Sequence, residues 1–151
     1  MPEFSANSAR NLLSCHQDLQ TVFHYVVKYF DCTIIYGHRS VEKQFELYKI
    51  GRELKGGKWT ETGNVVTFKD GVNNRSKHNE SPSHAVDAVP YPINWKDVDR
   101  LRYFAGYVKG VAQMLYDYGA ISHLIACGID WDNDTDLNDQ RFFDACHFQL
   151  V

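Results

Sequence analysis

Residues 76–92, SKHNESPSHAVDAVPYP, collect two histidines and an aspartate in a polar stretch without helical periodicity. His78, His84 and Asp87 are the residue types that bind zinc, through imidazole nitrogen and carboxylate oxygen. A polar loop seldom gathers them by chance, so this segment is a candidate metal site. The spacing alone leaves both histidines on an equal footing.

The segment DACH near the C-terminus supplies the remaining groups that hydrolysis with zinc would need. A catalytic zinc site takes three protein ligands and keeps one position open for water, so His147 could complete it. Zinc lowers the pKa of such a water toward about 7 and polarises a carbonyl. A separate carboxylate must then move a proton, and Asp144 could do so if the backbone directs both residues into one cavity. The helical H-E-x-x-H pattern is absent.

The elements that must position these residues fit one domain, residues 1–151, because domains cluster near roughly 100–150 residues. Apolar residues make up 44% of the chain, enough for a core. Apolar periodicity and β-branched runs do not alternate strictly along the chain, which favours an α+β fold with an antiparallel sheet flanked by helices. We expect helices at 8–30, 40–52 and 95–119, and strands at 32–38, 121–127 and 146–151.

Composition excludes several classes of protein. The net charge is −3, and basic residues never exceed two in a row, so we expect no nucleic-acid partner. No apolar run approaches the ~18 residues of a membrane span, and the N-terminal segment does not resemble a signal peptide. We therefore expect synthesis and folding in a cytosol, where the four scattered cysteines stay free thiols. A nucleophilic Cys146 beside His147 is weakly supported, because neighbours on a strand point to opposite faces.

Three segments occur in an order that resembles a known family: YGHRSVEKQFELYKIGR, SKHNESPSHAVDAVPYPINW and FFDACHFQL. From about Leu12 to Leu150 the chain is similar to bacteriophage endolysins of the zinc peptidase family. That family includes D-alanyl-D-alanine carboxypeptidases, dipeptidases and L-alanyl–D-glutamate endopeptidases. The resemblance implies a hedgehog/DD-peptidase-like fold and zinc-dependent cleavage of peptidoglycan.

Carried over position by position, the resemblance assigns roles to the candidate residues. His84 falls where the family pattern demands no ligand, so we interpret it as a substrate-contacting rim residue. His38 replaces an aromatic residue of the first motif and is interpreted as a wall residue, while Gln44 is expected to be structural. The implied roles are zinc ligation by His78, Asp87 and His147, general base catalysis by Asp144, carbonyl or carboxylate binding by Arg39, and a supporting or substrate-contacting hydroxyl at Ser76.

Two departures from the family pattern stand out. Eight residues separate His78 from Asp87, more than the commoner spacing, and the turn-rich NESPS stretch can absorb the excess. The terminal motif has Gln149 where a glutamate is common.

An acidic segment, IDWDNDTDLND, gives a second candidate metal site. Alternating carboxylates can bind Ca²⁺, but Thr135 and Arg141 stand where an EF-hand needs glycine and glutamate. A different Ca²⁺ site and a solvated acidic loop both remain open. Trp131 could stack on substrate or pack in the core, and His123 is interpreted as structural. The candidate Ca²⁺ ligands are Asp130, Asp132, Asp134 and Asp136.

The resulting prediction is a monomeric zinc peptidoglycan hydrolase that cleaves the L-alanyl–D-glutamate bond for host lysis. A holin would release it from the host cytoplasm to the cell wall. The alternatives are a D-alanyl-D-alanine carboxypeptidase and a non-catalytic wall-binding module. In that module His84 would be the fourth ligand of a closed, structural zinc site.

Overall fold

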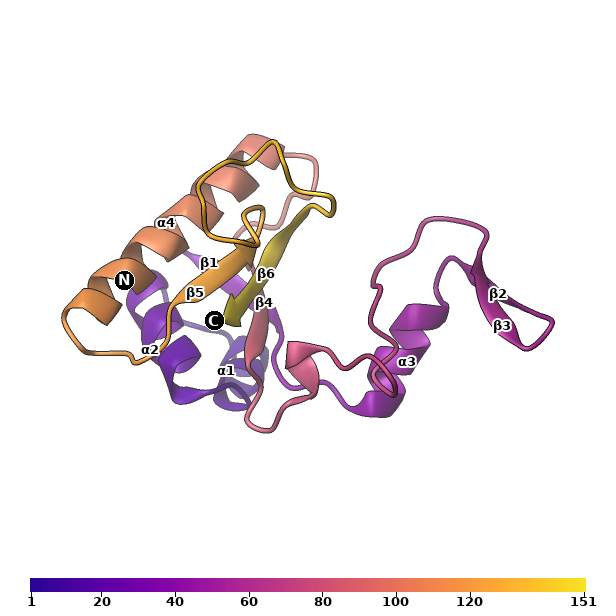
Figure 1. Cartoon of the computed structure of the whole chain (residues 1–151). Helices are drawn as coiled ribbons and strands as arrows, with labels where there is room; N and C mark the ends of the chain where they lie inside the picture. Colours follow the sequence, from indigo (N-terminus) through magenta and orange to yellow (C-terminus); the bar gives the residue numbers. More distant parts are fainter.

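An antiparallel sheet with the order β1–β4–β6–β5 forms the centre of the molecule. The computed structural model describes all 151 residues and is shown in Figure 1. The helices are α1 (Ala6–Leu13), α2 (Gln17–Val26), α3 (Val41–Lys49) and α4 (Val98–Asp117), with a short 3₁₀ turn, η1, at Lys77–Asn79. The central strands are β1 (Cys32–Tyr36), β4 (Ala85–Pro90), β5 (Ile125–Gly128) and β6 (Asp144–Leu150), and a separate hairpin pairs β2 (Arg52–Lys55) with β3 (Lys58–Glu61). This arrangement confirms the α+β prediction.

Strand alternation gives the sheet an apolar face and a polar face that carries Asp87 and His147. Val86 on β4 pairs with Phe148 on β6, and the next pair along is Asp87 with His147. Successive side chains on a strand point to opposite sides, so the two polar residues share the face away from the apolar pair. On the apolar face the Phe148 ring lies 5.4 Å from that of Phe23 on α2. Helices α2 and α4 thus bury one face and leave the other for a site.

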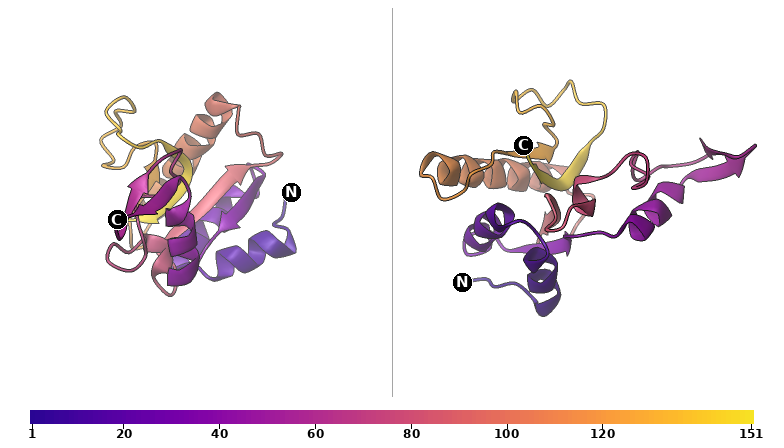
Figure 2. Two further views of the ribbon diagram at one scale, coloured as in Figure 1. Left: turned by 90° about the vertical axis from the view of Figure 1, so that its right-hand side faces the viewer. Right: turned by 60° about the horizontal axis from the view of Figure 1, so that its bottom comes forward.

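The long polar excursion after β1 forms an arm. Figure 2 shows α3 and the β2–β3 hairpin extending away from the central sheet. The chain then returns through residues 62–76 to η1, which lies beside β4. This return brings His78 to the sheet.

Several predicted boundaries were wrong for physical reasons. The single helix expected at 8–30 is two helices, because the His16 Nδ1 caps α2 by accepting from the Asp18 N–H. The backbone there pairs with Ser83 instead, through the His16 N–H and Ser83 oxygen at 2.8 Å. Residues 85–90 were interpreted as part of a polar loop, but they form β4, a fully buried central strand. Strand β5 begins only at Ile125.

Asp18 ties α2 to the segment that leads into β5. Its Oδ2 accepts from the N–H groups of Ser122 and His123, at 2.9 and 3.0 Å, and from the Ser122 hydroxyl at 3.1 Å. The His123 ring also lies 2.7 Å away through Nδ1. Burial alone would raise the pKa of Asp18, but these hydrogen bonds outweigh it and lower the pKa. The structural role predicted for His123 is consistent with these contacts.

We expect the stability that Asp18 contributes to disappear as the pH falls below about 4. An unfolded aspartate has a pKa near 3.9 and the folded one a lower pKa, so acid protonates the unfolded chain first. Asp18→Asn should cost roughly 2 kcal/mol at neutral pH and make the acid slope shallower. Urea denaturation of both proteins between pH 7 and 3 measures this. An identical slope in the two would contradict the assignment.

Candidate metal centre

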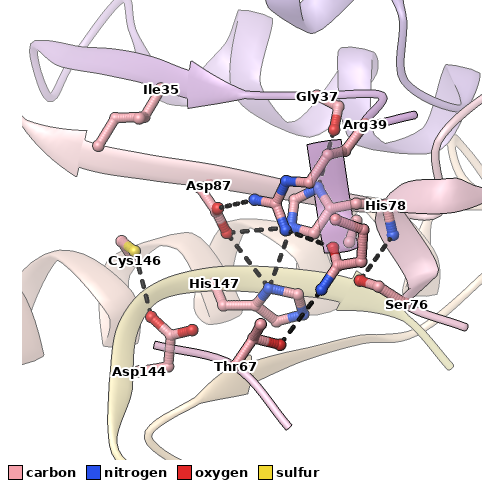
Figure 3. A network of polar contacts seen from close by, with 12 residues as sticks. Ile35, Gly37, Arg39, Thr67, Ser76, His78, Asp87, Asp144, Cys146 and His147 are labelled. Carbon is pink, nitrogen blue, oxygen red and sulfur yellow. Dashed lines mark hydrogen bonds and ion pairs between the residues drawn. The ribbon is translucent and has the colours of Figure 1, made fainter. Parts of the chain in front are cut away.

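Three side chains from η1, β4 and β6 converge on one point of the polar face of the sheet. The His78 Nε2 lies 3.2 Å from Asp87 Oδ1 and 3.3 Å from His147 Nδ1, and the last two atoms are 3.2 Å apart. All three residues are buried. Figure 3 shows them pointing toward one another beneath Arg39. The structure thus brings together the three residues predicted as zinc ligands.

The triangle of ligand atoms has the size that zinc needs. Tetrahedral zinc holds nitrogen and oxygen ligands at about 2.0–2.1 Å, which places neighbouring ligand atoms about 3.3–3.4 Å apart. The observed separations of 3.2, 3.2 and 3.3 Å are close to that value. Two imidazoles and one carboxylate leave a fourth position open, as in catalytic sites. The residues therefore fit a catalytic zinc ion.

Hydrogen bonds to the far side of each imidazole present the correct nitrogen. The His78 Nδ1 lies 2.8 Å from the Gly37 carbonyl oxygen, and His147 Nε2 lies 3.0 Å from Gln149 Oε1. Each acceptor holds the ring proton on that nitrogen and leaves the other one bare for a metal. Gly37 must be glycine, because a Cβ there would meet the Asn11 carbonyl oxygen at 2.1 Å. Gln149 thus has a role, fixing the His147 ring, that sequence reasoning missed.

Asp87 is held ionised by the groups around it. Burial would raise its pKa, but hydrogen bonds with His147 and His78 outweigh burial and hold the pKa far below the usual range. Its Oδ2 also accepts from the Arg39 guanidinium at 3.2 Å. Arg39 donates a second bond to Gln44 Oε1 at 2.8 Å, while its buried Nε has no partner. Arg39 therefore orients the central carboxylate, and Gln44 has the structural role that was expected.

Asp144 reaches the same cleft because β6 bulges. Cys127 pairs with Phe148, but the next residue of β5, Gly128, pairs with Asp144, so the three residues 145–147 bulge from the regular ladder. Only glycine allows this approach, since a Cβ on Gly128 would lie 2.1 Å from the Asp144 carbonyl oxygen. Burial, and then the charge of Asp87, raise the pKa of Asp144. A carboxyl with a raised pKa beside a metal centre suits proton transfer.

The cleft around these residues has a volume of about 930 Å³, within the range of ligand sites. It includes residues to which sequence reasoning gave no role, among them Trp95, Lys69 and Arg75. Trp95 on its rim is 55% exposed, which leaves its ring free for a ligand. Basic residues of the wall, beyond Arg39, are Lys69, Arg75 and Lys77.

Comparison with known proteins now gives the family. Residues 2–151 match the family described as phage L-alanyl-D-glutamate peptidase. The chain belongs to this family. A solved structure, the L-Ala D-Glu endopeptidase ChiX of Serratia marcescens, superposes with a TM-score of 0.60 at 21% identity, covering 99% of this chain and 90% of that one. That similarity shows a shared fold. No curated protein sequence matches the chain.

Family membership makes this phage L-alanyl-D-glutamate peptidase a hydrolase of peptidoglycan. The predicted peptidase activity and the preferred bond are thereby confirmed. No helix combines the length and apolar character needed to cross a bilayer.

Ser76 and Trp131 support residues of the candidate metal centre. The Ser76 hydroxyl accepts from the His78 N–H at 3.2 Å and caps η1. The Trp131 ring lies 5.1 Å from the His147 ring, and its indole N–H donates to the Phe142 carbonyl oxygen. Both residues also line the cleft, so a substrate contact stays a prediction for each. His84 lines the cleft too, but outside the triangle of ligand atoms.

The acidic segment is anchored by its first aspartate, Asp130. Asp130 is buried and forms an ion pair with Lys109, while its other oxygen accepts from the Asp134 N–H at 3.1 Å. Ligand atoms of Asp130, Asp132 and Asp134 lie within 4.8 Å of one another, and Asp136 is exposed and accepts from Asn138. Asp130 therefore braces this loop against α4.

Cys146 is unsuited to nucleophilic catalysis. Its Sγ lies 3.2 Å from Asp144 Oδ1, as a donor to that carboxylate. Burial, with the charges of Asp87 and Asp144, raises the pKa of the thiol far above its ordinary value. The reactive form of cysteine is the thiolate, so this thiol stays inert at neutral pH.

We expect all four cysteines to be unreactive in the folded peptidase. Burial raises the pKa values of Cys15 and Cys32 to about 12, and that of Cys127 is raised as well. A thiol-specific reagent at pH 8 should modify the native protein at least about 100-fold more slowly than the urea-unfolded chain, which should titrate four thiols. Rapid labelling of one native cysteine would contradict this.

Proposed function

We propose that this peptidase is a zinc-dependent endolysin, with zinc held by His78, Asp87 and His147. The observation that carries the proposal is the triangle of bare ligand atoms at 3.2–3.3 Å, each imidazole fixed by a partner on its far side. Zinc in this position would supply Lewis acidity, which polarises a peptide carbonyl and acidifies water. The open fourth position favours catalysis over a structural zinc site, and His84 does not close it.

In this proposal Asp144 transfers the protons and Arg39 stabilises the developing charge. Asp144 accepts a proton from the attacking water and passes it to the amine of D-glutamate as the bond to L-alanine breaks. Its raised pKa makes this carboxylate a stronger base than an ordinary aspartate, which favours acceptance of the proton from water. Arg39, fixed by Asp87 and Gln44, places a positive charge beside the triangle and stabilises the negative charge that develops on the carbonyl oxygen.

The cleft has the character needed for an acidic stem peptide. Lys69, Arg75 and Lys77 line its wall, and D-glutamate carries a carboxylate that they can bind. Trp95, Trp131 and His84 offer ring faces or edges to the sugar or peptide part of the substrate. We assign these residues to substrate binding, together with the Ser76 hydroxyl.

Mass spectrometry of fragments from purified murein tests the function directly. Cleavage of the proposed bond leaves L-alanine with a new carboxyl end and peptides that begin with D-glutamate. Released D-alanine would instead identify a carboxypeptidase. Binding to murein with full zinc content and no new termini would identify the wall-binding module.

We also propose a holin-dependent route to the substrate. Phage enzymes are made in the host cytoplasm, whereas peptidoglycan lies outside the cytoplasmic membrane, so the enzyme must cross it. Purified enzyme should lyse permeabilised Gram-negative cells and leave intact cells largely unaffected, as measured by turbidity. Equal lysis of both would contradict the need for a permeabilising partner. An antimicrobial use would depend on the same barrier.

A further inference from the structure

A second group of metal-binding side chains lies outside the cleft triangle, where α2 begins and the chain enters β5. One ligand atom from each of His16, Asp18 and His123 lies within 4.8 Å of the others. The His123 Nδ1 is 2.7 Å from Asp18 Oδ2, and His16 Nδ1 is 4.0 Å from Asp18 Oδ1. His123 is 105 positions from Asp18 in the chain, so only the tertiary fold creates this group.

A third imidazole adjoins the group. The His16 ring centroid is 4.9 Å from that of His123 and 5.7 Å from that of His84, in edge-on contacts. His84 follows Ser83, whose oxygen accepts from the His16 N–H, so the backbone holds these rings close. Three imidazoles thus gather beside one carboxylate.

The structural role of Asp18 does not account for the histidines. Asp18 Oδ2 alone accepts the bonds that fix Ser122 and His123. Asp18 Oδ1, the Nε2 atoms of His16 and His123, and the whole His84 ring make no hydrogen bond within the protein. The side chains of His16 and His123 are 27% and 40% exposed, so an ion in solvent can reach them.

We propose that His16, Asp18 and His123 form a second zinc-binding site, with His84 placed to join as a further ligand. Imidazole nitrogen with one carboxylate suits zinc, whereas Ca²⁺ would require mainly oxygen ligands. Asp18 is a fixed anchor because its neighbours already orient it. The side chains of both histidines are partly exposed, and their Nε2 atoms make no hydrogen bond that zinc binding would have to break. The site is separate from the cleft triangle and does not depend on the proposed hydrolysis.

Zinc titration of the metal-stripped full-length chain, followed by calorimetry, tests the proposal. The unmodified protein should bind two equivalents. His123→Ala and, independently, His16→Asn should bind one, or bind the second at least about 100-fold more weakly. Asparagine is chosen at position 16 because it still caps α2. His24→Ala, an exposed histidine on the same helix, is the matched control and should bind two.

Two further measurements separate the outcomes. Circular dichroism must show that each variant is folded, and the two independent substitutions guard against one that is not. Asp87→Ala should lose the other equivalent and keep the one assigned here, so failure of the cleft centre is distinguishable from failure of this site. The proposal is overturned if Asp87→Ala binds no zinc while the unmodified protein binds one equivalent, or if both folded histidine variants bind as much zinc as the unmodified protein with unchanged affinity.

Discussion

Asp144→Asn should lower kcat/KM for murein by about 10²–10⁴-fold while zinc binding stays intact, because it removes the proton-transferring carboxylate and leaves the ligands in place. Asparagine is nearly isosteric and can still accept a hydrogen bond from Cys146, so the bulge of β6 should survive. Murein turbidity assays and zinc analysis by mass spectrometry on the same samples measure both quantities.

The pH profile sharpens this prediction. Burial, and then Asp87, raise the pKa of Asp144, so activity should be lost on the acid side at a higher pH than an ordinary aspartate would give. The residual activity of Asp144→Asn should lack that acid limb. Glu80→Gln, which changes another carboxylate of the same cleft, is the control and should retain most of the activity. Unchanged hydrolysis by zinc-loaded Asp144→Asn would remove Asp144 from the mechanism.

Asp87→Ala should abolish activity, empty the cleft centre and destabilise the metal-free chain. Asp87 is the shared partner of both imidazoles and of Arg39. Its loss leaves the Arg39 charge buried without a carboxylate, and breaking a buried ion pair in this way costs about 3–5 kcal/mol. Asp87→Ala also removes the only carboxylate among the three proposed ligands. Zinc content after dialysis, urea denaturation with chelator present and the murein assay test the three effects.

Asp70→Asn is the matched control for this substitution. Asp70 is a partly exposed aspartate that accepts hydrogen bonds from the backbone of its own turn and does not line the cleft. It should keep zinc, activity and most of its stability. Full zinc occupancy of the cleft centre in Asp87→Ala would contradict the proposed ligand set.

The helices show how much of the fold can be predicted from apolar periodicity. The apolar residues of α4 recur at three- and four-residue steps, and the structure buries six of them, from Leu101 to Ala112. The same periodicity joined α1 and α2 into one helix. Periodicity could not predict that the His16 side chain caps a new helix, because capping depends on a side-chain conformation and not on hydrophobic spacing.

The positions of the site residues could not be predicted from local sequence. Residues 85–90 carry Asp87 in a run that the sequence pattern predicts as loop, yet they form β4, one of the two central strands of the sheet. A central strand is defined by the partners on both sides, which lie more than 40 residues away in the chain. Likewise the bulge of β6 opposite Gly128, which brings Asp144 to the cleft, exists only in the pairing of β5 with β6.

By itself the sequence determined the chemistry of this protein: two histidines, two aspartates and an arginine in an order shared with a peptidase family, on a chain able to bury a core. The tertiary structure decided which atoms meet. It brought His78, Asp87 and His147 to 3.2–3.3 Å, set Gly37 and Gln149 behind the imidazoles and left His84 beside His16. Sequence fixes residue types and local spacing, whereas strand register and long-range pairing fix distances, and metal binding depends on distances of a few ångströms.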